Sequence, residues 1–224
     1  MGGEVYMTLN PAKVIGGVLL AAFMATLGGC ALVGVIGQAI PVTVHAEYAG
    51  LKGQKIAVMC WVDRGIRIDY PQLQLDTATF VQTQLIDQKS VGELKESQWP
   101  WEARSIIRFQ REHPELEGRP INEYAHRISG VTRLIYIEVD QFSTRGEETV
   151  QLKRGRMLGR VKVLEIAEGK SRIVYEKQNI EVVFPPKRPE GVLDMPESQV
   201  YAETVKMFGL SIGQLFYSRE VDRE

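Results

Sequence analysis

The chain has 224 residues, a formal net charge of −1 and charged side chains at 25% of its positions. Together with a hydrophobic content of 44%, this charge is typical of a folded globular domain and excludes an intrinsically disordered chain. A nucleic-acid-binding domain usually carries an excess of lysine and arginine, so nucleic acid is not an expected partner. Two cysteines, Cys30 and Cys60, do not favour a disulfide framework.

The N-terminal segment predicts export. An apolar stretch from Val14 to Leu27 follows Lys13 and precedes small residues, which is the layout of a secretory signal peptide. Translation from Met7 instead of Met1 would give this segment a more positive start. Residues 14–44 carry no charge, so an uncleaved transmembrane anchor, which needs roughly 20 apolar residues, stays open as an alternative, although the glycines in this stretch weaken a helix.

The apolar stretch ends in Leu27-Gly28-Gly29-Cys30. This tetrapeptide resembles the lipobox of bacterial lipoproteins, in which an aliphatic residue and two small residues precede a cysteine. The resemblance implies that residues 1–29 are cut off, that the Cys30 thiol carries a diacylglycerol and that the new amino group is acylated too. Several acyl chains, at about 0.8 kcal/mol per buried CH₂, give effectively permanent membrane attachment. Ala31, in place of an aspartate, implies the outer membrane in a two-membrane bacterium.

The first half of the mature chain predicts a strand followed by helices. After a lipidated tether over residues 30–50, β-forming residues predict a buried strand over 54–62, in which Cys60 is interpreted as a plain buried thiol. Asp76 offers an N-cap to a helix that ends near Gln88. The other elements expected here are a short strand over 91–96 and helices over 102–112 and 121–129.

The second half predicts strands and a closing helix. Alternating apolar residues indicate a central strand over 131–142. Two further strands, over 157–166 and 173–184, are joined by Glu168-Gly169-Lys170, which indicates a hairpin turn. A final helix from about Glu197 carries an apolar stripe, and we expect it to pack on the sheet.

Hairpins are antiparallel and strand–helix–strand units are parallel, so this order predicts one α/β domain with a mixed parallel and antiparallel sheet of about five strands flanked by helices. The domain spans residues 51–219, and a tail follows over 220–224. Behind a lipobox, the element order, Lys55-Ile56-Ala57-Val58 and Ile135-Tyr136-Ile137 resemble penicillin-binding-protein activator lipoproteins, the curli secretion lipoprotein and the N-terminal domain of the Tol-system periplasmic protein. The resemblance implies a domain that binds other proteins or assembles, without enzymatic chemistry.

One catalytic pattern occurs near the C-terminus. Gly209-Leu210-Ser211-Ile212-Gly213 matches the G-x-S-x-G nucleophile elbow, which requires a preceding strand and a later histidine. It lies inside the expected last helix, so close helix packing is the competing interpretation, and a membrane-tethered serine hydrolase using Ser211 is the alternative function. All histidines precede the motif, too far apart for a metal site. No nucleotide-binding motif is present, so neither metal nor cofactor is expected.

Two features suggest partner contacts. Trp99-Pro100-Trp101 could present aromatic anchors or cap the edge of the core. The cluster Lys153-Arg154-Gly155-Arg156 could contact anionic lipid or an acidic partner or form a solvated loop. The sequence therefore predicts a non-enzymatic envelope protein that is anchored through Cys30, faces the periplasm and docks on another envelope protein. It leaves the oligomeric state open. The candidate partner contacts are Trp99, Trp101, Arg154 and Arg156.

Overall fold

The computed structural model describes residues 41–90, 92–146, 152–188 and 190–221. Residues 45–219 form one compact unit, and a smaller unit contains strand β1 (Val42–Val44), which pairs with β6 (Arg219–Val221). The predicted signal peptide, Cys30 and most of the tether lie outside the described residues. Within the described ranges, no helix is long and apolar enough to cross a membrane.

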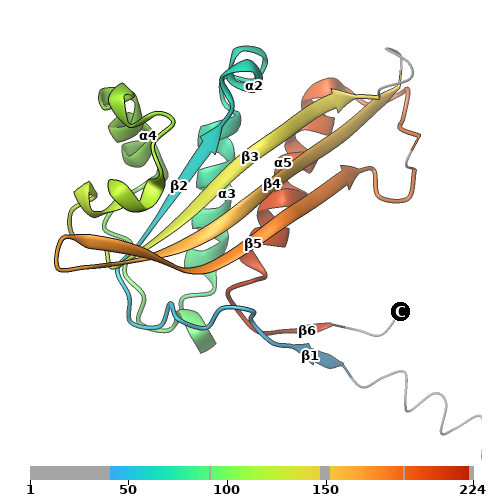
Figure 1. The fold of residues 1–224 in the computed structure, drawn as a ribbon. Helices are drawn as coiled ribbons and strands as arrows, with labels where there is room; N and C mark the ends of the chain where they lie inside the picture. The colour runs from blue at the N-terminus through green and yellow to red at the C-terminus, as the bar shows by residue number, and fades with distance from the viewer. Residues whose placement is uncertain (1–40, 91, 147–151, 189, 222–224) are drawn as a thin grey trace, which may run out of the picture. The chain divides into compact units, whose positions relative to one another are not determined.

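The larger unit is built on a mixed sheet with the order β2-β3-β4-β5 (Figure 1). Strands β2 and β3 run parallel, and β3, β4 and β5 are antiparallel, which confirms the predicted mixed α/β fold. Glu168 and Gly169 form the tight turn between β4 and β5, both with positive φ, as a two-residue hairpin turn requires. The strand bounds are Ile56–Val62 for β2, Arg133–Arg145 for β3, Lys153–Ala167 for β4 and Lys170–Phe184 for β5.

Two helices, α3 (Leu73–Asp87) and α5 (Glu197–Gly213), cover one face of the sheet (Figure 1). Alternate residues of the strands point into this core, as the period of two requires. The apolar stripe of α5 packs there as predicted, with Val205, Phe208 and Ile212 buried. Strand β2 is almost completely buried on both faces, because α3 packs on one face and α4 packs on the other. Its continuous apolar run predicts this burial.

The opposite face of the sheet is covered only in part. Helix α4 (Ala103–Glu112) and three short 3₁₀ turns lie over Ala57 and Met59 of β2 and Leu134 of β3, where they form a second apolar cluster. The rest of this face, over β4 and β5, carries charged side chains. The turns are η2 (Pro114–Leu116), η3 (Ile121–Glu123) and η4 (Ala125–Arg127).

Three predicted elements are wrong or displaced. Residues 92–94 form a 3₁₀ turn, η1 (Gly92–Leu94), and not a strand, because Gly92 and Glu96 adopt positive φ. The helix expected over 121–129 is replaced by η3 and η4, with a break at Tyr124 where the backbone leaves helical geometry. Helix α3 begins three residues before Asp76, whose carboxylate accepts a hydrogen bond from Tyr201 instead of capping the helix.

Candidate functional site

The Trp99-Pro100-Trp101 segment does not form a paired anchor. Trp99 packs against the core beneath α3 and α5, whereas Trp101 packs in the cluster beneath α4. The indole nitrogen of Trp101 donates to the Ser129 carbonyl (2.8 Å). Gln82 holds the segment from α3, since its amide donates to the Trp101 carbonyl (2.7 Å) and accepts from the Ala103 amide (2.6 Å). Both indoles are partly buried and contribute to packing.

The basic cluster around Arg154 and Arg156 belongs to β4, so the solvated-loop interpretation is wrong. Burial alternates along this strand, and Arg154, Arg156, Arg160 and Lys162 share the face that α3 and α5 leave open. A parallel row of carboxylates neutralises most of this stripe. Arg156 pairs with Glu181 (2.8 Å), and Arg160 and Lys162 each lie 2.8 Å from Glu138.

Glu138 is the most enclosed acid of this row, with 17% of its side chain exposed. Burial tends to raise the pKa of its carboxyl, but hydrogen bonds from Arg160 and Lys162 outweigh that effect and hold the pKa below its usual range. The group is therefore an ionised member of a structural ion-pair network. On this stripe of β4, Arg156, Arg160 and Lys162 are paired, whereas Arg154 makes no ion pair with a described residue.

Ser211 lies inside α5, with no strand before it. Its hydroxyl donates to the Met207 carbonyl one turn earlier (3.0 Å). The neighbouring glycines allow α5 to approach α3 closely, because a Cβ on Gly209 would meet the Phe80 ring and a Cβ on Gly213 would meet the Gln84 amide. The nucleophile-elbow geometry is absent at Ser211, and helix packing accounts for the motif.

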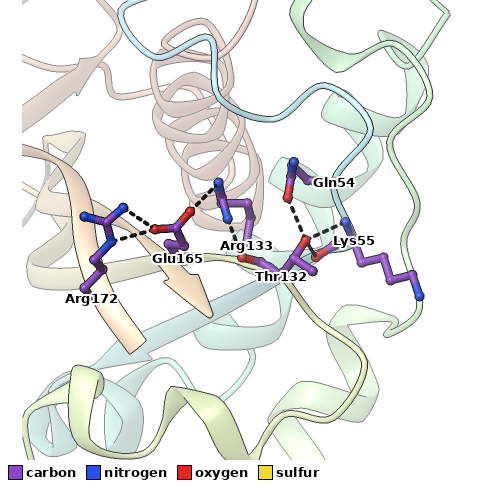
Figure 2. A network of polar contacts seen from close by, with 6 residues as sticks. All are labelled: Gln54, Lys55, Thr132, Arg133, Glu165 and Arg172. Atoms are coloured by element: carbon purple, nitrogen blue, oxygen red, sulfur yellow. Dashed lines mark hydrogen bonds and ion pairs between the residues drawn. The ribbon is translucent and has the colours of Figure 1, made fainter. Parts of the chain in front are cut away.

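Polar contacts fix the amino end of the sheet, which we define as the end where β2 and β3 begin (Figure 2). The Thr132 hydroxyl donates to the Gln54 side chain and accepts from the Lys55 amide, both at 2.9 Å. Arg133 and Arg172 both bind the Glu165 carboxylate, so β3, β4 and β5 are joined side by side. These contacts are internal and set the strand register.

A hollow lies at the other, carboxyl end of β2, around Trp61. Two adjoining cavities of about 400 Å³ and about 250 Å³ share Trp61, Leu116 and Tyr124 as lining residues. A third cavity of about 400 Å³ adjoins the first through Arg67 and Glu117. We name this continuous surface the Trp61 hollow. In α/β sheets, the space beyond the carboxyl ends of parallel strands is a common place for ligands.

The wall of the hollow is held by contacts from several elements. Asp63 follows β2 and caps the short helix α2 (Arg64–Asp69) by accepting a hydrogen bond from the Gly65 amide (2.8 Å). The sequence did not predict this helix. From α2, the Arg67 guanidinium lies 4.7 Å from the centre of the Trp61 ring and 2.5 Å from a Glu117 oxygen. This cation–π contact and the ion pair position the indole against η2.

Gln74 and Gln110, which line the hollow, are held by one shared carbonyl. Gln74 of α3 and Gln110 of α4 both donate to the Cys60 carbonyl, at 2.8 and 3.1 Å, and Gln74 also donates to the Gln110 side chain (3.0 Å). Helices from both faces of the sheet are therefore tied to one backbone oxygen of β2. The Cys60 thiol itself is fully buried, as predicted, and burial raises its pKa well above the usual range.

The charge of the hollow is unbalanced. Its acids, Glu117 and Glu138, are already paired with cations. In contrast, Arg64, Arg111 and Arg119 line the hollow, and none of them belongs to an ion pair between described residues. The uncompensated charge is therefore positive. Over the described residues, no cluster of three metal-ligating side chains occurs.

No protein-family model matches the sequence, and no curated protein matches it. Solved structures with a similar chain arrangement include lipoprotein GNA1162 from Neisseria meningitidis, which is 11% identical over 71% of this chain and 97% of its own, with a TM-score of 0.42. PelC from Paraburkholderia phytofirmans, solved as a dodecamer, is 11% identical over 78% and 98%, with a TM-score of 0.40. The hypothetical protein CT253 from Chlamydia trachomatis is 12% identical over 71% and 98%, with a TM-score of 0.36.

Proposed function

We propose that this chain is a lipid-anchored cell-envelope protein that faces the periplasm and docks on another envelope protein without catalysing a reaction. The sequence Leu27-Gly28-Gly29-Cys30 behind an apolar export segment carries the proposal. An outer-membrane location is favoured where the cell has two membranes. The partly covered face of the sheet and the Trp61 hollow supply the surface for docking.

The geometry of residues 45–219 supports this role. The Ala46 amide donates to Ser218, and the Tyr48 amide donates to the Leu215 carbonyl, so the chain enters the domain near the end of α5. The first residue of α5, Glu197, accepts a hydrogen bond from Thr144 near the end of β3. The last turn of α5 therefore lies at the opposite, amino end of the sheet. Strand β2 then rises at about 3.3 Å per residue towards the Trp61 hollow.

This arrangement keeps the hollow away from the point where a lipid tether would attach. Roughly 15 residues between Cys30 and His45 reach at most about 50 Å when fully extended, so the domain would stay close to the bilayer. The hollow would lie at the end of the domain opposite the tether, where a partner can approach it.

The mass of detergent-extracted protein tests the anchor. We expect a mature chain that begins at Cys30 and carries added acyl mass, and we expect Cys30→Ala to lose this mass. Cys60→Ala is the matched control and should keep it, because the Cys60 thiol is buried. An unmodified chain that retains residues 14–29 would contradict the proposal.

Photo-crosslinking in intact cells tests docking. A crosslinking amino acid at Ile68, which is 72% exposed on α2 beside the hollow, should give a discrete adduct with one envelope protein. The same amino acid at Lys170, on the hairpin at the amino end of the sheet, is the control and should not give that adduct. Labelling by a serine-reactive fluorophosphonate that is lost in Ser211→Ala would overturn the non-enzymatic role.

A further inference from the structure

We infer that the Trp61 hollow binds an extended acidic segment of a protein partner, with carboxylates paired to Arg64, Arg111 and Arg119 and an apolar side chain seated beside Trp61. This inference rests on the proposed docking function and names the chemistry of the partner. It draws on the charge, the lining and the continuity of the hollow.

Charge complementarity selects an acidic partner. Arg64, Arg111 and Arg119 come from α2, α4 and the segment before η3, and each lines a different part of the hollow. Elsewhere on the same side of the sheet, Arg156 and Arg160 are neutralised by carboxylates. Three cations that make no ion pair with a described residue therefore line one concave surface, which attracts negative charge and disfavours basic partners.

The lining selects an apolar side chain between the charges. Trp61, Phe109, Pro114 and Leu116 surround the cavity of about 400 Å³, which lies within the range of pockets that enclose small organic groups. Aromatic and aliphatic anchors seated in such pockets supply much of the affinity of protein interfaces. An aromatic or long aliphatic side chain of the partner would rest on the Trp61 ring.

The shape selects an extended segment. The three cavities follow one another through shared residues, from Ile68 on α2, past Trp61, to Tyr136 on β3. Successive side chains of an extended segment alternate in direction, so acidic residues can meet the arginines while the residue between them enters the cavity. A small ligand would fill one cavity and leave the other cations unpaired.

The pair of Arg67 and Glu117 adds an internal competitor. Glu117 occupies one terminal nitrogen of the guanidinium, and the Arg67 Nε is buried with no hydrogen-bond partner in the described part of the chain. A guanidinium offers five N–H donors in a fork that suits a carboxylate. Glu117 also lines the cavities that hold Arg64 and Arg111, so its charge repels an acidic segment, and neutralising Glu117 should strengthen the binding of that segment.

Peptide selection on the full-length, detergent-solubilised protein tests the inference. Random dodecapeptides displayed on phage should be enriched for sequences that combine Asp or Glu with an aromatic or long aliphatic residue. A labelled synthetic copy of the most enriched peptide is then titrated by fluorescence anisotropy, next to a copy in which glutamines and asparagines replace its acids. Selection of neutral or basic peptides would overturn the inference.

Variants of the hollow give opposite expected results. The double variant Arg111→Gln/Arg119→Gln should bind the acidic peptide at least tenfold more weakly, and Lys170→Gln, at the amino end of the sheet, should bind as the wild type does. Glu117→Gln should bind several-fold more tightly, a gain that misfolding cannot mimic. Equal affinity for the double variant and the wild type, or weaker binding by Glu117→Gln, would overturn the inference.

Failure of the anchor and failure of the peptide site remain distinguishable. Peptide affinity should be the same for lipidated protein and for Cys30→Ala, because the hollow lies within residues 45–219. A non-lipidated chain that binds acidic peptides would refute the proposed lipid anchor and leave the proposed peptide site standing. A lipidated chain that selects no acidic peptide would refute the proposed peptide site and leave the proposed lipid anchor standing.

Discussion

Replacing Gly209 by alanine should destabilise the protein, and the same replacement should stabilise it once Phe80 is also alanine. An ideal Cβ on Gly209 would lie 2.4 Å from Cδ1 of Phe80 and 3.1 Å from its Cε1. Overpacking of this kind costs about 1–3 kcal/mol. Alanine in place of glycine inside a helix stabilises by about 1 kcal/mol, so the net loss for Gly209→Ala is about 1 kcal/mol.

In the Phe80→Ala background the steric cost disappears and only the helix propensity remains. Gly209→Ala should then raise the free energy of unfolding by about 1 kcal/mol. The change of sign corresponds to a coupling energy of about 2 kcal/mol between the two positions, which is large enough for a double-mutant cycle to resolve.

Urea denaturation followed by far-ultraviolet circular dichroism measures these changes as shifts of the midpoint at constant slope. Ser211→Ala is the matched control on the same helix. Because its hydroxyl bonds only the carbonyl one turn earlier, we expect a change within about 0.5 kcal/mol in both backgrounds. If Gly209→Ala had the same sign with and without the Phe80 ring, close packing of α5 on α3 would not explain the glycine.

Three further predictions follow from buried groups. The Cys60 thiol, which is buried and has a raised pKa, should resist maleimide in the native protein and react only after unfolding. Gln82→Leu should cost about 1–3 kcal/mol in thermal denaturation, because the carbonyl of Trp101 loses its donor and an α4 amide loses its acceptor. Glu138 has a lowered pKa in the folded state. Its contribution to the free energy of unfolding is therefore complete above its ordinary pKa of 4.5 and is lost as pH falls through the lowered pKa. Glu138→Gln should therefore make the free energy of unfolding, measured by urea midpoints, fall less steeply as pH drops below 4.5, and an unchanged pH profile would contradict this.

Strands and the closing helix could be predicted because their signals are local. The Glu168-Gly169 turn fixes the β4–β5 hairpin. The alternation in β3 separates the residues that enter the core beneath α3 and α5 from those that enter the second apolar cluster. In α5, the stripe through Val205, Phe208 and Ile212 has the helical period and is buried. In each case one physical pattern, either a turn with positive φ or a constant repeat, has no competing interpretation.

Errors occurred where a short segment had two possible roles. Asp76 is a good N-cap by type, yet its carboxylate accepts a hydrogen bond from Tyr201 of α5, a contact 125 positions away in the chain. Asp63 directly follows the predicted strand and caps α2, a helix that the sequence did not predict. Between Pro120 and Gly130, apolar residues at helical spacing are buried in the second apolar cluster, but two 3₁₀ turns carry them. The periodicity therefore predicted the buried positions correctly and the α-helix wrongly.

The Trp61 hollow could not be predicted because its parts are adjacent only in the folded chain. Trp61 lies in the apolar run that predicts a buried strand, and Arg64 and Arg67 lie between that strand and the helix at Asp76, where the sequence predicts no element. The connection between β2 and β3 places α2, α4 and η2 around the same end of β2, which brings Arg111 and Glu117 to the indole. A tryptophan at the end of a buried strand, followed by arginines, is the local signal that could have marked the site.

Pairing decides which basic residues can bind a partner, and pairing is a property of the fold. Arg154 and Arg156 formed the conspicuous cluster in the sequence, yet strand β5 supplies Glu181 as a partner for Arg156. Arg111 and Arg119 are isolated in the sequence, and neither forms an ion pair with a described carboxylate, although Glu117 and Glu138 line the same cavities. Since the charge of Arg156 is offset by its carboxylate partner, the arginines that line the Trp61 hollow, and not Arg156, carry the charge that can select an acidic partner.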